Sequence, residues 1–149
     1  QGINNYLVEI GGEIRGKGMN PEQQFWRIGV ETPSVFQTGA QKVIALEDVS
    51  VATSGDYRNF FEREGVRYSH TIDPTTGRPV IDDIASITVL AHTSMAADGL
   101  ATAFMALGEQ GALRLAEELS LPVYILRYQQ DVFSESFSSG FSHYLNEKK

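Results

Sequence analysis

Asp98 and Thr102 are two oxygen-bearing side chains whose chemical types and spacing suit the binding of a metal ion. They lie in the segment A-H-T-S-M-A-A-D-G-L-A-T, residues 91–102. On a helix, a spacing of four residues puts both side chains on one face. A carboxylate and a hydroxyl suit Mg²⁺, which keeps phosphate oxygens and water among its ligands. The structural alternative is that Asp98 stabilises the positive end of the helix while Thr102 hydrogen-bonds to the preceding turn.

A second segment, S-H-T-I-D-P-T-T-G-R-P at residues 69–79, combines an imidazole, a carboxylate and hydroxyls around a glycine turn. His70 carries the proton that moves most readily near neutral pH, so it could act as an acid or a base. The alternative is an Asp-Pro-x-x-Gly turn stabilised by hydroxyls, with His70 a strand residue bonded to the backbone.

A third segment, T-S-G-D-Y-R at residues 53–58, lies between two predicted strands. The small residues Ser54 and Gly55 let the backbone approach a ligand closely, and Asp56 and Arg58 stand beside that approach. The alternative is a hairpin turn with a surface ion pair.

A sheet and a pair of helices must position these segments. Apolar alternation and β-branched residues predict most of the strands, and Gly11-Gly12 is expected to break or bulge the first one. The predicted strands are 6–10, 13–15, 25–31, two within 43–53, 57–61, 66–72, 84–91, 123–128 and 132–137. An apolar stripe predicts a helix over 94–107 that ends at Gly108, followed by a second helix over 109–119. The fold class is therefore α+β, with helices packed on a mixed, mainly antiparallel sheet.

Composition limits the possible functions. A chain of 149 residues is long enough for one compact domain with its own core. The net charge of −7 argues against nucleic-acid binding, which needs a basic face. Acidity does not exclude a phosphate-bearing ligand, because a bound cation can supply the local positive charge. Cysteine is absent from the sequence, which excludes disulfides, zinc thiolate sites and cysteine nucleophiles within it.

In their order along the chain, these motifs resemble the ApbE family of flavin transferases. The resemblance rests on S-G-D-Y-R at 54–58, S-H-x-I-D-P-x-T-G-R-P at 69–79 and A-x-T-S-M-A-A-D-G-L-A-T-A at 91–103. The opening V-E-I-G-G-E-I-R-G-K-G at 8–18 also looks like that family's I-G-G-E-x-x-x-x-G segment. The resemblance therefore extends from about Tyr6 to the C-terminus.

The resemblance implies a Mg²⁺-dependent enzyme that moves FMN from FAD onto a Ser or Thr hydroxyl of a partner protein and releases AMP. Asp98 and Thr102 would be the metal ligands, and His70 would lie at the reacting phosphate. The residues implied for the flavin pocket are Glu13, Ser54, Asp56, Ile72, Asp73, Pro74 and Thr76. Partners of the family are flavin-accepting subunits of bacterial membrane redox complexes, and its members are periplasmic lipoproteins of the inner membrane.

Physical chemistry agrees with these roles and leaves alternatives open. Cleavage of a pyrophosphate requires neutralisation of its oxygens, and the attacking hydroxyl needs a base. His70 is the best base available, and Asp56 and Asp73 are alternatives. Tyr57, Ile72 and Met95 are the nearest apolar walls for a flavin ring. Two other functions remain: an FAD pyrophosphatase that yields FMN and AMP, and a flavin-binding module without chemistry.

The sequence departs from the family in one large respect and one small one. Family members carry a D-x-G-x-x-A-K-G segment that contributes to the flavin pocket and adds a metal contact, and residues 1–149 contain no such segment. Residues 1–149 are therefore expected to form the C-terminal portion of an ApbE-like transferase, without its N-terminal half. Gly99 and Ala101 stand where the family more often has Ala and Ser, but the spacing of the two metal ligands is kept.

Overall fold

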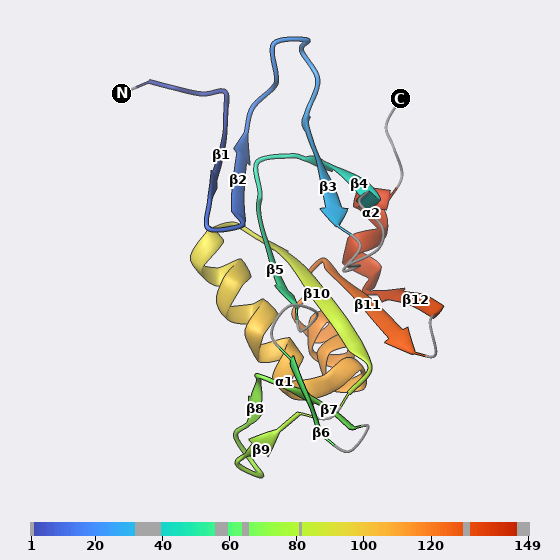
Figure 1. Ribbon diagram of the computed structural model, residues 1–149. Helices are drawn as coiled ribbons and strands as arrows, with labels where there is room; N and C mark the ends of the chain where they lie inside the picture. Colours follow the sequence, from blue (N-terminus) through green and yellow to red (C-terminus); the bar gives the residue numbers. More distant parts are fainter. Residues whose placement is uncertain are drawn as a thin grey trace.

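The main body of the protein is a six-stranded sheet with helix α1 across one face (Figure 1). The computed structural model describes residues 2–31, 40–55, 60–63, 66–80, 82–129 and 132–145. The strand order is β1-β2-β5-β10-β11-β12, and each neighbouring pair is antiparallel. The strands are β1 Tyr6–Ile10, β2 Glu13–Lys17, β5 Ser50–Gly55, β10 Ile84–Ala91, β11 Val123–Gln129 and β12 Val132–Phe137.

Three further antiparallel strand pairs lie outside this sheet. They are β3 Trp26–Glu31 with β4 Ala40–Leu46, β6 Phe60–Arg63 with β7 Val66–Ser69, and β8 Ile72–Asp73 with β9 Arg78–Pro79. Figure 1 shows β8 and β9 close to the bend in α1, at the end of the sheet away from β3 and β4. The prediction of an α+β fold with a mainly antiparallel sheet is therefore confirmed.

Strand β10 is the centre of the core. All of its residues except Ala91 are buried, as its near-continuous apolar run predicted. It is flanked by β5 and β11 and covered on both faces. On one face, Ile87 and Val89 pack with Phe104 and other residues of α1. On the opposite face, Leu90 packs with residues of β3, β4 and the C-terminal segment.

Helix α1, Ser94–Glu118, begins and bends where the sequence predicted. The Thr93 side chain caps its start by accepting a hydrogen bond from the Ala96 amide at 3.2 Å, which satisfies an N–H group that the helix itself leaves unpaired. Gly108 interrupts the helix with φ 68° and ψ 171°, a conformation that is essentially restricted to glycine. The prediction of two consecutive helices separated at Gly108 is therefore confirmed.

Gly11-Gly12 end the first strand, which confirms the expected break, and they do not form a bulge. They are the turn of the β1–β2 hairpin, in which Ile10 pairs with Glu13. Both glycines have positive φ angles, 70° and 106°. A two-residue hairpin turn favours such angles because they match the twist of the paired strands.

The C-terminal segment closes the sheet face opposite α1. It consists of the short helices η1 Ser139–Phe141 and α2 Ser142–Leu145. Buried Ser138 fixes its start, because its hydroxyl accepts from the Val123 amide at 2.9 Å and donates to the Leu121 carbonyl at 2.6 Å. Phe141 is fully buried and stacks on Tyr124 with ring centroids 5.3 Å apart.

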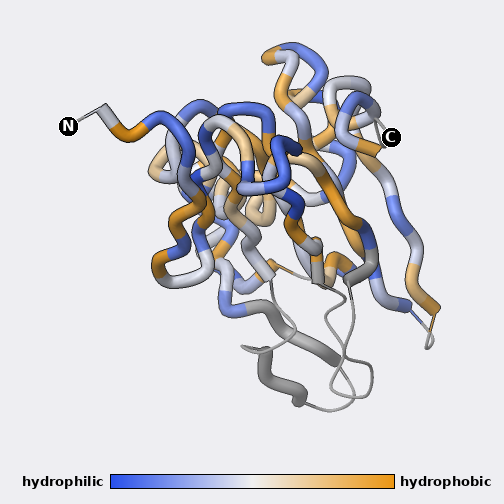
Figure 2. The backbone as a smooth tube through the Cα atoms, turned by 90° about the horizontal axis from the view of Figure 1, so that it is seen from above, coloured by the Kyte–Doolittle hydropathy of each residue, from blue (hydrophilic) through white to orange (hydrophobic). Residues whose placement is uncertain are grey.

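Hydrophobic residues are found both in the core and at the N-terminal edge. Figure 2 shows orange stretches in strands crossing the middle of the molecule and in the N-terminal hairpin near the N label. In that hairpin Val8 is 44% exposed and Ile10 is 75% exposed. No described helix is both long enough and apolar enough to cross a membrane.

Candidate functional site

The β8–β9 turn holds the first group of predicted site residues in a compact hydrogen-bonded unit. The Asp73 carboxylate accepts hydrogen bonds from the Thr75 amide at 2.8 Å and the Thr75 hydroxyl at 2.7 Å. The Thr76 hydroxyl donates to the same carboxylate at 2.9 Å. Gly77, with φ 66°, completes the turn by donating its amide to the Asp73 carbonyl at 2.8 Å. The turn therefore has a defined shape before any ligand arrives.

These hydrogen bonds change the acidity of Asp73. The Thr75 hydroxyl, the Thr75 amide and the Thr76 hydroxyl all stabilise the ionised form, and together they lower the pKa of Asp73 below its ordinary value of 3.8. A carboxylate with a lowered pKa and occupied lone pairs is a weak proton acceptor. Asp73 is therefore better suited to shaping the turn than to taking a proton from a substrate.

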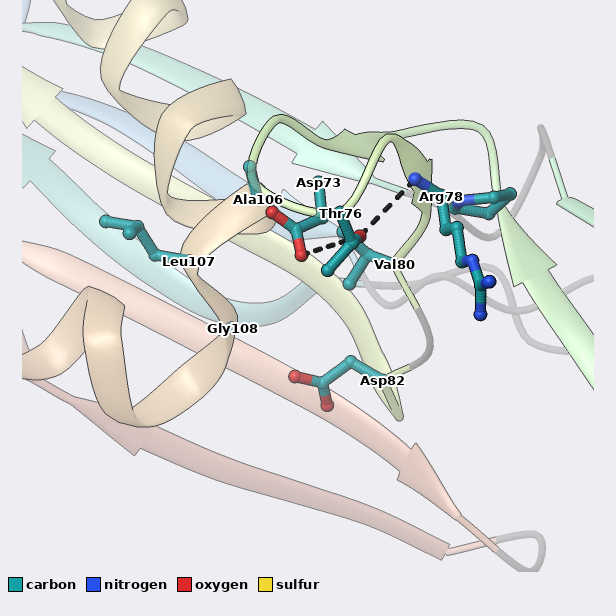
Figure 3. A pocket seen from close by; sticks show the side chains of 9 residues that line it. Asp73, Thr76, Arg78, Val80, Asp82, Ala106, Leu107 and Gly108 are labelled. Atoms are coloured by element: carbon teal, nitrogen blue, oxygen red, sulfur yellow. Dashed lines mark hydrogen bonds between the residues drawn. The ribbon is translucent and has the colours of Figure 1, made fainter.

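A cavity of about 610 Å³ lies between this turn and the bend in α1 (Figure 3). Figure 3 shows the Asp82 carboxylate directed toward Gly108, while the Arg78 side chain extends away from the Asp73 carboxylate. The lining residues come from the turn, from the segment before β10 and from the bend: Asp73, Thr76, Arg78, Pro79, Val80, Asp82, Ala106, Leu107 and Gly108. Two of the predicted site residues, Asp73 and Thr76, thus line a cavity.

Asp98 and Thr102 are both exposed on α1. They stand two residues before and two residues after Leu100, which packs against the core. Each is therefore rotated by about 200° from Leu100 around the helix axis, which turns both side chains away from the core. Neither side chain makes a hydrogen bond or ion pair with any part of the chain that the structure describes.

The fold does not show the alternative roles, in which Asp98 stabilises the start of the helix and Thr102 bonds to the preceding turn. The first turn of α1 contains no acidic residue, so Asp98 lies beyond the turn where the helix dipole acts most strongly. The hydroxyl of Thr102 does not bond back to the described helix backbone. Two hard oxygen donors on one helix face, not engaged by the described protein, fit the few protein ligands that Mg²⁺ takes.

Helix α1 connects this pair with the cavity. Ala106 lines the cavity and follows Thr102 by four residues, which is one helical turn or about 6 Å along the axis. Helix α1 also contacts β5, β10 and, less extensively, β2 and β8. The helix therefore carries the Asp98–Thr102 face one turn before a residue that lines the cavity beside the β8–β9 turn.

The other predicted residues are distributed more widely. His70 is exposed and precedes β8, next to Thr71, whose carbonyl accepts from the Val80 amide at 2.9 Å. Ile72 is 50% exposed, and Pro74 is an exposed residue of the turn. Ser54 is half-buried in β5 and pairs with Ile87, on the sheet face that carries α1.

Glu13 lies apart from the β8–β9 turn, half-buried at the start of β2. Of the predicted flavin walls, Met95 is 84% exposed near the start of α1. Asp56 and Tyr57 lie outside the described residues.

Sequence reasoning missed the other residues that line the cavity: Arg78, Pro79, Val80, Asp82, Ala106, Leu107 and Gly108. Arg78 lay within a recognised motif, and its charge was the one signal that could have drawn attention to it. Asp82 and Leu107 belong to no motif. They become lining residues only because the bend at Gly108 lies close to the segment before β10.

Comparison with known proteins identifies the family of this fold and site. The sequence model of the ApbE family matches residues 1–125. A protein of Vibrio cholerae named FAD:protein FMN transferase is 52% identical over 146 residues, which are 98% of this chain and 44% of that protein. The chain thus spans less than half the length of that curated relative.

Solved structures agree with this assignment. The flavin transferase ApbE from Vibrio cholerae superposes with a TM-score of 0.83 and 50% identity over 97% of this chain and 46% of that one. The apo form of the Pseudomonas stutzeri flavinyl transferase ApbE gives a TM-score of 0.84 and 41% identity over 97% of this chain and 44% of that one. The extent of both matches agrees with the motifs found along the sequence, and the chain belongs to the ApbE family.

Proposed function

We propose that this chain is part of an FAD:protein FMN transferase, which moves FMN from FAD to a Ser or Thr hydroxyl of a partner protein and releases AMP. The observation that carries the proposal is the placement of two chemically distinct groups along α1. The Asp98–Thr102 oxygen pair lies on its exposed face, and the preformed Asp73–Thr76 turn lies beside its bend. Relatives that bear this activity in their names match nearly the whole chain.

The proposed enzyme depends on Mg²⁺, which Asp98 and Thr102 would hold. Their carboxylate and hydroxyl oxygens are the donor types that this cation prefers, and they point away from the core. When bound, the cation would neutralise phosphate oxygens of FAD. The chain has a net charge of −7, so a diphosphate would meet unfavourable electrostatics without such compensation.

His70 is the proposed base for the acceptor hydroxyl. The alternative base Asp73 is disfavoured because Thr75 and Thr76 lower its pKa and occupy its oxygens. His70 is exposed next to that turn, so a partner protein could bring its hydroxyl to the imidazole. The turn then contributes shape and hydrogen-bonding groups, and His70 contributes proton transfer.

The acceptor in this proposal is a protein, namely a flavin-accepting subunit of a bacterial membrane redox complex reached on the periplasmic side of the membrane. Support comes from the family resemblance and from the relatives' names, which specify a protein as acceptor. The exposure of Asp98, Thr102 and His70 agrees with an acceptor as large as a protein, because a macromolecule cannot reach groups buried in the core.

The test is mass spectrometry of a flavin-accepting subunit after incubation with FAD, Mg²⁺ and the protein. The proposal expects a mass gain equal to one FMN residue, together with AMP. The mass gain should be lost in the His70→Ala variant while FAD binding is retained. Free FMN and AMP without any mass gain would replace the transferase with an FAD pyrophosphatase. FAD binding without either product would leave only a flavin-binding module.

A further inference from the structure

Arg127, on β11, bridges two carboxylates, one from the segment before β10 and one from α1 directly after its bend. One guanidinium nitrogen, Nη1, lies 3.1 Å from Glu109 Oε2, and the other, Nη2, lies 3.6 Å from Asp83 Oδ2. The Arg127 side chain is 32% exposed, so water screens the bridge only partly. The Ser136 hydroxyl donates to Glu109 Oε1 at 2.6 Å and holds that carboxylate in place.

Each carboxylate of the bridge is the sequence neighbour of a residue that lines the cavity. Glu109 follows Gly108, the residue at the bend, and Asp83 follows Asp82. Gly108 and Asp82 lie close together, because a Cβ atom added to Gly108 would lie 3.1 Å from Asp82 Oδ2. The bridge therefore joins the two segments that carry these lining residues, namely the bend of α1 and the segment before β10.

The backbone supports the same arrangement. Ile84 pairs with Arg127 in the β10–β11 ladder, and the Tyr128 amide donates to the Asp83 carbonyl at 2.8 Å. The ladder has a register shift between Ile84 and Ser86, so β-pairing alone holds this end of β10 less regularly. The side-chain bridge supplies the second attachment.

We propose that Arg127 is a positioning residue that sets the separation of the α1 bend from the segment before β10, and thereby the shape of the cavity that Asp73 and Thr76 line. Its effect on FAD affinity rests on the function proposed above. Its effect on the cavity itself does not. Arginine is suited to this role because its planar fork presents separate nitrogens to two acceptors, whereas the single ammonium of lysine is a point charge.

The direct test is amide hydrogen exchange of the ligand-free protein with Arg127→Met and Arg127→Lys. The reporters are Gly77 and Val80, whose amides donate to Asp73 and Thr71 in the turn region. Exchange at both should accelerate by about tenfold in Arg127→Met, which corresponds to the loss of one modest interaction. Arg127→Lys should recover less than half of that change. Exchange at the Leu119 amide, which donates to Leu115 beyond the bend, should stay unchanged.

The matched control is Lys42→Met, which removes a similarly exposed pair with Glu135 on β12. This control should leave Gly77 and Val80 unchanged. The proposal is overturned if Arg127→Met exchanges like the wild type, or if it accelerates Leu119 as much as Gly77, since a uniform change reports a merely structural role. If Arg127→Lys restored wild-type exchange at Gly77 and Val80, the proposal that the two-pronged guanidinium is required would be overturned.

FAD affinity, measured by flavin fluorescence, separates this inference from the proposed function. The Arg127→Lys variant should bind FAD several-fold more weakly than the wild type, and its turnover at saturating FAD should be closer to normal than its affinity. If the wild type binds FAD and Arg127→Lys binds it equally well, the positioning role fails. If the wild type binds no FAD, the proposed function fails, and the hydrogen-exchange result still decides whether Arg127 shapes the cavity.

Discussion

Acidic side chains on the two sides of this molecule differ in how completely the protein satisfies them. Near the C-terminal segment, Glu135 accepts a hydrogen bond from the Tyr124 hydroxyl at 3.1 Å and pairs with Lys42 at 3.0 Å. On α1, Asp98 has no partner in the part of the chain that the structure describes. A carboxylate with a structural role is matched by neighbours in the same fold. An exposed carboxylate without neighbours, beside a hydroxyl on the same face, is available for a ligand.

Polar groups on the two sides also differ in the direction in which their surroundings shift the pKa. Burial, and next the nearby Glu135 charge, raise the pKa of Tyr124 far above its ordinary value, so this phenol stays protonated and donates to Glu135. The partners of Asp73, by contrast, lower the pKa of that residue at the surface. The C-terminal side thus uses Tyr124 and Glu135 to hold the core, whereas the side chains of Asp98 and Thr102 on α1 face outward without a partner among the described residues.

The largest expected effect comes from Phe141→Ala on the C-terminal side. Phe141 is fully buried against Tyr124, so its truncation should lower the free energy of unfolding by about 3–5 kcal/mol, as measured by urea denaturation. FMN transfer per folded molecule should be unchanged. Phe137→Ala is the control, because Phe137 is 41% exposed and should cost less. An equal loss in both variants would contradict the assignment of Phe141 to the core.

Asp98→Asn on α1 should have the opposite pattern of effects, with stability kept and FMN transfer lost. Because Asp98 has no described partner, the free energy of unfolding should change by no more than about 0.5 kcal/mol. FMN transfer should fall by about a hundredfold or more, since a charged oxygen for the cation is lost. Glu118→Gln, an exposed acidic residue at the end of the same helix, is the control and should alter neither. A large stability loss without a loss of transfer would assign Asp98 a structural role.

Gly108→Ala should weaken the bend on which both groups of site residues depend. Alanine tolerates φ 68° and ψ 171° poorly, so the free energy of unfolding should fall by about 1–3 kcal/mol. Gly99→Ala is the control on the same helix. Open space surrounds Gly99, and alanine is the better helix former, so this change should stabilise the protein by up to about 1 kcal/mol. If thermal denaturation showed that both substitutions change the free energy of unfolding in the same direction, the bend geometry would be contradicted.

The smallest effect concerns the acidity of Asp73. Thr75→Val removes the hydroxyl that lowers this pKa most, so the pKa should rise further in Thr75→Val than in Thr76→Val, as measured by carboxyl NMR titration. Ionised Asp73 stabilises the folded turn above its unfolded-state pKa, and this contribution disappears as the pH falls through the lower folded-state value. In Thr75→Val the turn should therefore lose less stability than in the wild type when the pH is lowered. The reverse ranking of the two variants would contradict the hydrogen-bond assignment.

The sequence predicted the elements whose signals are local. The apolar run of β10 and the apolar stripe interrupted at Gly108 each lie within one element, so pattern and propensity sufficed to define them. The Asp98–Thr102 pair was likewise predicted, because a spacing of four residues defines a helix face without knowledge of the rest of the fold.

The sequence did not predict features that depend on residues far apart. The Arg127 bridge joins β11, the bend and the segment before β10, and no local pattern marks such contacts. The cavity residue Asp82 was missed for the same reason. At Gly11-Gly12 a local signal existed but was ambiguous, because glycine pairs occur in bulges and in hairpin turns, and only the pairing of Ile10 with Glu13 decides between them.

Paramagnetic broadening of backbone NMR signals by Mn²⁺, used as a probe for Mg²⁺ in the presence of FAD, reports directly whether the Asp98–Thr102 face of α1 binds the cation. Signals of Asp98 and Thr102 should broaden first, those of Glu117 and Glu135 should not broaden, and Asp98→Asn should abolish the effect. Broadening centred on Glu117 or Glu135, or none at Asp98 while FAD is bound, would contradict the claim that the unpartnered face of α1 is the metal site.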